Sequence, residues 1–235
     1  MRTAKQAASA LAVMAALTGL AGCGSGTEQS TGTVSIMRSV AAPVLSKLPG
    51  RAPAKGPAKA PDVEGMAARA LAANPNPLIL AGIEAFGGVQ VMALNGSNDT
   101  MRTYMTPSMQ ALILRNGLLV GTRGLGHDLS VAELNQVAPL ILGRRAGEGT
   151  RTMRYLTGDA VERPLTVACK VAVGERKSVP FAGRSWSGAT VAESCKGGGV
   201  RFTNTYLVGD NGTALVSQQW IGPGMGSVTI QTIRE

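Results

Sequence analysis

The feature that most constrains the fold is a series of short apolar runs separated by turn residues, which covers residues 78–234. The clearest unit is 110–122, where Asn116-Gly117 separates two such runs. Asn-Gly readily takes the positive φ angles of a type I′ turn, so this unit predicts a β-hairpin. We expect strands near 78–86, 89–94, 100–105, 110–115, 118–122, 150–157, 165–173, 177–181, 190–195, 200–208, 213–221 and 227–234. Short strands with turn signals about every 8–12 residues predict a mainly β fold, an antiparallel sandwich or half-open barrel.

Helical signals are confined to two short stretches. Residues 63–73 are rich in Ala, Leu and Met, with Asp62 placed as an N-cap and a stop at Asn74-Pro75. Ser130-Val131-Ala132-Glu133 matches a capping box and predicts a helical turn that ends before Pro139. One or two short helices are too few to cover the faces of a parallel α/β sheet.

The N-terminal residues have the pattern of an export signal. Arg2 and Lys5 precede an apolar run over residues 11–20, which is too short to span a bilayer. Leu20-Ala21-Gly22-Cys23 follows and matches a bacterial lipobox, in which cleavage precedes the cysteine and the cysteine carries the lipid. The sequence therefore predicts a lipoprotein signal peptide at 1–22 and lipidation of Cys23. The alternative is a plain secretory signal with a chance cysteine at the cleavage site.

The rest of the chain divides into a tether and one domain. Residues 23–61 contain the lipidated cysteine and a Pro/Ala/Lys-rich stretch, which opposes regular structure. Residues 62–235 have the length of a single β-rich domain. The formal net charge of +9 owes much to the tether, which either lies against an anionic surface or is simply solvated. Aromatic residues make up only 3%, and they are not interleaved with basic residues, so we expect no nucleic-acid partner.

With Cys23 lipidated, Cys169 and Cys195 remain as a pair in an oxidising compartment. We expect them to form a disulfide, which would contribute roughly 3–4 kcal/mol by the chain-entropy argument. The alternative is two unlinked thiols in adjacent strands.

Few residues point to catalysis. His127 is the single histidine, so a site with two histidine ligands is excluded, and no known nucleophile or phosphate-loop motif occurs. His127 could act as a general base that Asp128 orients. A loop histidine that is hydrogen-bonded for structural reasons is the better interpretation of this pair. Paired carboxylates for glycoside cleavage remain open, but none is marked out by spacing. We expect no catalytic residues, no metal and no cofactor, and interpret the chain as a non-enzyme.

A group of arginines lies around the glycine-rich stretch 143–149. It has two interpretations: a site for a polyanionic glycan or a partner's acidic face, or solvated charges that protect a strand edge. The group comprises Arg144, Arg145, Arg151 and Arg154.

Three strings occur along the chain: 116–120 with 122–126 and Asp128-Leu129; Glu193-Ser194-Cys195 with Phe202, Asn204 and Tyr206; and 217–223. Together and in this order they resemble the YjbF/GfcB family of group 4 capsule polysaccharide lipoproteins, over about residues 66–235. One departure is Leu207 after Tyr206, where the family pattern leads us to expect Trp.

The resemblance implies a mostly antiparallel β fold, related to the half-open barrels of lipoprotein-carrier proteins. It implies a non-catalytic accessory in exopolysaccharide or capsule secretion, whose partners are the membrane, other export proteins or the polysaccharide. Gly24 after the cysteine implies sorting to the outer membrane, with the domain facing the periplasm. Arg123 and Asp128 form a candidate contact loop, joined by an expected ion pair. Two alternatives remain: a LolA/LolB-like carrier of acyl chains, and a hydrolase of envelope glycans.

Overall fold

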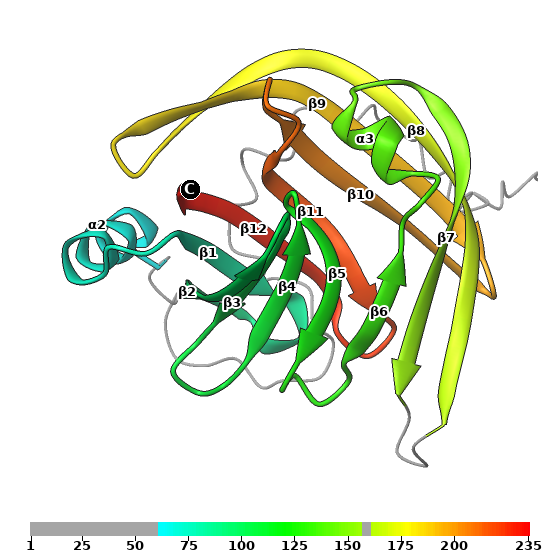
Figure 1. The fold of residues 1–235 in the computed structure, drawn as a ribbon, viewed down its shortest axis with the longest axis horizontal. Helices are drawn as coiled ribbons and strands as arrows, with labels where there is room; N and C mark the ends of the chain where they lie inside the picture. Colours follow the sequence, from blue (N-terminus) through cyan, green and yellow to red (C-terminus); the bar gives the residue numbers. More distant parts are fainter. Residues whose placement is uncertain (1–60, 157–160) are drawn as a thin grey trace, which may run out of the picture. The chain divides into compact units, whose positions relative to one another are not determined.

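The computed structural model describes residues 61–156 and 161–235. These residues form one 12-stranded antiparallel sheet in the order β5-β4-β3-β2-β1-β12-β11-β10-β9-β8-β7-β6 (Figure 1). The two edge strands, β5 and β6, lie beside each other without a backbone ladder between them. The sheet is therefore a nearly closed barrel, which confirms the expected mainly β class and its barrel form.

The first half of the sheet comprises β1 (Leu78–Ile83), β2 (Gly88–Asn98), β3 (Met101–Met105), β4 (Ala111–Arg115), β5 (Leu118–Arg123) and β6 (Leu129–Glu133). The second half comprises β7 (Gly147–Leu156), β8 (Glu162–Phe181), β9 (Arg184–Gly197), β10 (Val200–Val208), β11 (Ala214–Gly222) and β12 (Gly226–Arg234). The described helices are α2 (Val63–Ala73), α3 (Ala138–Leu142) and a short 3-10 turn, η2 (Glu84–Phe86). No helix in this described part is long and apolar enough to cross a membrane.

The Asn116-Gly117 turn joins β4 and β5 as expected. Asn116 has φ 49° and Gly117 has φ 81°, the positive angles that a type I′ turn requires. A Cβ on Gly117 would lie 2.2 Å from the Ala214 carbonyl oxygen, so only glycine allows this turn to approach the start of β11. The Ala214 amide donates to the Asn116 carbonyl at 3.0 Å, which ties the hairpin to β11.

Helix α2 starts and stops where its sequence predicts. The Asp62 side chain accepts a hydrogen bond from the Gly65 amide at 2.9 Å, and the helix ends at Asn74 before Pro75. Its buried side packs against β1, β2 and β12 (Figure 1). At its end, Arg234 of β12 donates to the Leu71 carbonyl at 3.1 Å, so α2 is fixed to the last strand.

The helical turn expected from the capping-box pattern at 130–133 is wrong. These residues belong to β6, which pairs with β7 and buries Leu129 and Ala132. The helix begins later, at Ala138, with Pro139 in its first turn rather than after its end. Proline fits there because the first amides of a helix have no partner within the helix. Tertiary pairing of β6 therefore overrides the local capping signal.

The strands expected at 165–173 and 177–181 are one continuous strand, β8. Gly174, Glu175 and Arg176 lie between the two expected strands, and the β8–β9 register shifts between Val173 and Arg176. A bulge of this kind bends a strand without ending it. The end of β8 and the start of β9 can therefore extend beyond the barrel as a long curved hairpin (Figure 1).

Two apolar clusters pack on opposite faces of the sheet. The inner cluster contains residues from nearly every strand, together with Ile141 of α3 and its N-cap Val137. The outer cluster joins α2, β1 and β12 to Phe181 and Trp186 at the end of the β8–β9 hairpin. Leu207, which stands where we expected Trp, is buried in this outer cluster.

Candidate functional site

The most distinctive chemical feature inside the barrel is a buried carboxylate, Glu193 of β9. Strand side chains alternate between the two faces, so Glu193 shares the inner face with Val191 and Cys195. Its side chain is 0% exposed, and an isolated charge at such a position would be strongly disfavoured. The surrounding strands must therefore supply partners.

One oxygen of Glu193 accepts three hydrogen bonds. Oε2 receives Arg151 Nη1 at 3.0 Å, Asn204 Nδ2 at 2.8 Å and the Tyr206 hydroxyl at 2.8 Å. Arg151 lies on β7 and is 2% exposed, whereas Asn204 and Tyr206 lie on β10 and are fully buried. The network thus joins β7, β9 and β10 through one ion pair and two neutral donors. Arg151 Nε and Glu193 Oε1 have no hydrogen-bond partner within the described residues.

The electrostatics of this network favour neutral tyrosine and charged arginine. Burial is the main cause that raises the pKa of the Tyr206 hydroxyl well above its ordinary value, and the adjacent Glu193 charge adds to it. Burial is the largest single influence and lowers the pKa of Arg151, but Glu193 together with Tyr206 and Tyr155 outweighs it and leaves the pKa raised. Arg151 is therefore held as a cation and Tyr206 as a hydrogen-bond donor.

Asn204 extends the network to β11. Its Oδ1 accepts the Trp220 amide at 2.7 Å, beyond the end of the β10–β11 backbone ladder. The Trp220 ring stacks on Phe202, with ring centroids 4.4 Å apart and planes 13° from parallel. Side chains therefore connect β10 and β11 where backbone pairing has stopped.

A second buried polar contact links distant parts of the chain. Gln219 of β11 accepts the Leu119 amide at 2.8 Å and donates to the Gly117 carbonyl at 2.8 Å. Its amide also donates to the Ser217 hydroxyl at 2.9 Å. The side chain thus fixes the β4–β5 hairpin against β11. These strands are not neighbours in the sheet order, so the contact runs across the barrel.

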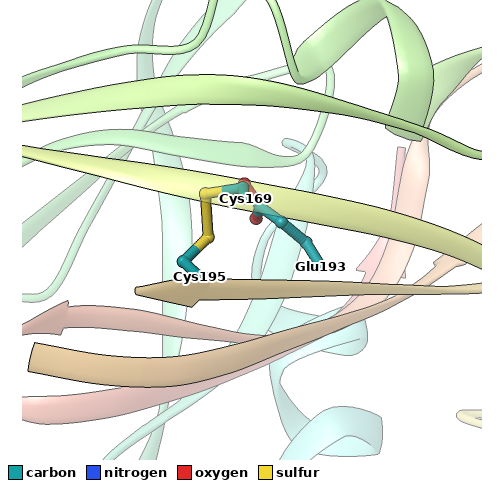
Figure 2. Close-up of side chains that lie close together, drawn as sticks. All are labelled: Cys169, Glu193 and Cys195. Carbon is teal, nitrogen blue, oxygen red and sulfur yellow. A yellow bond between two sulfur atoms is a disulfide. The ribbon is translucent and has the colours of Figure 1, made fainter. Parts of the chain in front are cut away.

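Cys169 of β8 and Cys195 of β9 form a disulfide, as expected. Their Cα atoms are 4.1 Å apart and directly opposite in register. Figure 2 shows Glu193 beside the bridged sulfurs, and the ligand-type atoms of the three residues lie within 4.8 Å of one another. The sulfurs are bonded to each other and are not thiolates, so this group does not have the donors of a cysteine metal site.

Arg123 and Asp128 lie at the open seam between β5 and β6. Arg123 Nη1 donates to the carbonyls of Thr122 at 2.6 Å, Leu129 at 3.2 Å and Ser130 at 3.3 Å. Its guanidinium thus replaces the missing backbone ladder at this end of the seam. The carbonyls come from both edge strands, so Arg123 holds them together.

Asp128 closes the turn between the same strands, but not through Arg123. Its carboxylate accepts from the Thr122 hydroxyl at 2.8 Å and from the Gly124 and Leu125 amides at 2.9 and 3.2 Å. The expected Arg123–Asp128 ion pair is wrong, because backbone and hydroxyl groups satisfy both side chains separately. A role for this loop in partner contact remains a prediction.

Two cavities bounded by described residues lie outside the barrel. One, of about 470 Å³, is bounded by α2 and the β8–β9 turn, with Glu64, Leu71 and Ala182 in its lining. The other, of about 350 Å³, is bounded by the start of β9 and the β10–β11 turn. A carrier of acyl chains requires an apolar cavity within the barrel. Neither of these two cavities lies there, and the side chains of the inner cluster pack against one another in the described interior.

Comparison with families of known proteins matches residues 52–233 to the family described as "Group 4 capsule polysaccharide lipoprotein gfcB, YjbF". The chain belongs to this family. Among solved structures, it is similar to the hypothetical lipoprotein YmcC from Escherichia coli (K12), with a TM-score of 0.63 and 19% identity. That similarity covers 72% of this chain and 89% of YmcC, and it shows the shared fold. No curated protein matches the chain.

Several residues of the strings that resemble the YjbF/GfcB family lie inside the barrel. Glu193, Asn204 and Tyr206 form the carboxylate network, whereas Gln219 binds the hairpin that carries Gly117. Phe202 and Tyr206 are buried in the inner cluster, and Trp220 packs against it. These motif residues therefore stabilise the barrel of this chain.

The arginine group around 143–149 does not form one patch. Arg151 is buried against Glu193, Arg154 pairs with Glu133 at 2.9 Å, and Arg144 lies 3.5 Å from Asp210. The interpretation of Arg151 as a solvated charge is wrong, because strand alternation places it on the inner face of β7. Cys23, the predicted lipidation site, lies outside the described residues.

Sequence reasoning missed the Arg151–Glu193 pair. A signal was present for Glu193, because it lies two residues from Val191 and from Cys195 in a strand with alternating burial. Its partner was harder to find, since Arg151 is 42 residues away in sequence.

The exposed His127 packs close to Gly224, where an added Cβ would lie 2.9 Å from the imidazole Cγ.

Proposed function

We propose that this YjbF/GfcB-family lipoprotein is anchored to the outer membrane through Cys23, faces the periplasm, and acts without catalysis in the secretion or assembly of an extracellular polysaccharide. In this proposal residues 1–22 are the signal peptide, 23–61 the tether and 62–235 the working domain. The observation that carries it is the family match, because the family is described by both its lipoprotein nature and its capsule polysaccharide.

Two features of the chain support an exported location. The Leu20-Ala21-Gly22-Cys23 pattern predicts lipid attachment, and Gly24 lacks the acidic residue that favours inner-membrane retention. The Cys169–Cys195 disulfide suits an oxidising compartment such as the periplasm.

The described side chains support action by contact. Glu193 is buried and its Oε2 is occupied by three donors. Asp128 is engaged by turn amides, and Asp210 by Arg176 at 2.8 Å. We infer that these acids stabilise structure and that the protein works by holding another envelope protein or the polysaccharide.

The test is deletion of the gene, followed by complementation with two forms of the protein. One is wild type. The other, the lipid-free chain, carries Cys23→Ser behind the cleavable signal of a soluble periplasmic protein in place of residues 1–22. We expect deletion to reduce the amount or length of surface polysaccharide, wild type to restore it, and the lipid-free chain to fractionate as soluble and restore it poorly. Unchanged polysaccharide after deletion, or full rescue by the lipid-free chain, would contradict the proposal.

A further inference from the structure

The outer face of β8, β9 and β10 carries an unusual placement of charge. Lys196 of β9 lies directly opposite Arg201 of β10 in the antiparallel register. On its other side Lys196 faces Ala168 of β8, which is small and uncharged. Residues opposite each other in a ladder point to the same side of the sheet. Lys196 and Arg201 are both exposed, so two like charges are adjacent on the surface.

The next row on the same face continues this composition. Lys170 of β8 lies opposite Ser194 of β9, which lies opposite Thr203 of β10. The Ser194 and Thr203 hydroxyls are 3.3 Å apart, and all three residues are exposed. The acid in this row is Glu148, opposite Lys170 on β7. We define Lys170, Ser194, Lys196, Arg201 and Thr203 as the basic outer face.

Like charges directly opposite each other in a ladder destabilise a sheet. Lys196 and Arg201 have no opposite charge as a register partner, since their partners are Ala168 and each other. An anion bound across the two strands would offset the repulsion. The arrangement therefore costs stability in the free protein and favours a negatively charged ligand.

We propose that the basic outer face binds an anionic polysaccharide. This inference rests on the proposed function and names the ligand class that the domain would contact. Arg201 supplies a planar fork for carboxylate groups, and Lys196 and Lys170 supply point charges. The Ser194 and Thr203 hydroxyls exchange hydrogen bonds with sugar hydroxyls. Adjacent strands are about 4.8 Å apart, so the two rows present charge and hydroxyls over an extended surface.

A polysaccharide fits this face better than an anionic bilayer. Proteins that lie on bilayers combine basic residues with apolar side chains that enter the acyl boundary. The basic outer face has none. The exposed large hydrophobic residues in the described part of the chain, none of them on this face, are Phe86, Met109, Val131, Val161 and Val173.

The binding test uses the lipid-free chain, with polygalacturonate as the anionic probe and dextran as the neutral one. We expect wild type to bind polygalacturonate in a salt-dependent manner and to ignore dextran. Lys196→Gln combined with Arg201→Gln should weaken that binding by about tenfold or more. The matched control is Arg102→Gln with Arg115→Gln, which removes the same charge from exposed positions on β3 and β4 and should bind as wild type.

Equal losses in both double variants would reduce the effect to net charge and overturn the proposal. Binding to vesicles of equal parts phosphatidylglycerol and phosphatidylcholine, without binding to polygalacturonate, would overturn it in favour of a membrane surface.

Thermal unfolding gives a readout that needs no ligand. The Lys196→Gln/Arg201→Gln variant should melt about 1–3 °C higher than wild type, because the cross-strand repulsion is gone. A lower melting temperature would show that these residues support the fold instead.

Complementation separates this inference from the proposed function. If deletion alters the polysaccharide and the Lys196→Gln/Arg201→Gln lipoprotein restores it fully, the face is not the binding surface but the function stands. If deletion has no effect on the polysaccharide, the proposed function fails, whether or not the protein binds polygalacturonate.

Discussion

Glu193 shows how one residue can constrain several strands. Its carboxylate is satisfied only when Arg151, Asn204 and Tyr206 arrive from β7 and β10 in the correct register. Removal of one member of a buried pair leaves an uncompensated charge, which costs more than the pair itself contributes. The network therefore penalises a slipped register more than apolar packing alone would.

We predict that Glu193→Gln lowers the free energy of unfolding by about 3–5 kcal/mol, because Arg151 remains buried without its counter-charge. Urea denaturation measures the loss. The control combines Glu193→Gln with Arg151→Met, which removes both charges and should recover much of the stability. A single variant within about 1 kcal/mol of wild type would show that the pair contributes little.

The raised pKa of Tyr206 gives a prediction at alkaline pH. Its folded-state pKa lies above the ordinary value of 10.0, so its contribution is fully present below pH 10 and is lost as pH rises towards the folded value. In this window the unfolded chain releases the proton and the folded chain keeps it. The free energy of unfolding should then fall by up to about 1.4 kcal/mol per pH unit for this tyrosine. Tyr206→Phe should be less stable at neutral pH but show a shallower decline from pH 10 to 11; identical slopes would exclude Tyr206 as the source.

At the scale of elements, the seam between β5 and β6 is the place where backbone pairing fails. Two sequential strands joined by a short turn would ordinarily form a hairpin, yet here they close the barrel edge to edge through side chains. Arg123 bonds the carbonyls of Leu129 and Ser130, and the Thr122 hydroxyl accepts the Leu129 amide at 2.9 Å. Closure at this point depends on a few residues rather than on a ladder.

We predict that Arg123→Ala loosens the seam and lowers the free energy of unfolding by about 1–2 kcal/mol, through loss of charged hydrogen bonds to carbonyls. Hydrogen exchange should be faster in peptides that cover 118–133 and unchanged in those that cover β8 and β9. Arg102→Ala, at an exposed position on β3, is the control and should leave exchange in 118–133 unaltered. Faster exchange throughout the domain would point to global destabilisation instead of a local seam.

At the scale of the whole molecule, the described barrel and its two apolar clusters are built between α2 and β12. We predict that the lipid-free chain has the same melting temperature as the lipoprotein in neutral detergent, and that its Cys169–Cys195 disulfide still forms. Thermal unfolding and mass spectrometry of unreduced protein measure both. A clearly lower melting temperature would show that the lipid itself stabilises the domain.

Local signals predicted those parts of the fold whose cause is local. Asn116-Gly117 fixes its own turn, Asp62 caps its own helix, and the alternation of apolar residues defines most strands. The prediction failed where distant residues decide the outcome. Ser130–Glu133 resembles a helix start, but pairing with β7 makes it a strand. Arg151 resembles a surface charge until Glu193, far away in sequence, is placed beside it.

The barrel pairs its earliest strand with its latest, Leu78 of β1 lying opposite Arg234 of β12. In a polypeptide that is synthesised and exported from its N-terminus, β1 therefore emerges long before β12, its pairing partner, is available. The hairpins on either side can form early from local contacts, whereas the join between the two ends must wait for the final residues. We expect a premature stop codon that removes only β12 to abolish the mature product. Without β12, both β1 and β11 would have unpaired backbone groups along one edge, and such edge strands promote aggregation.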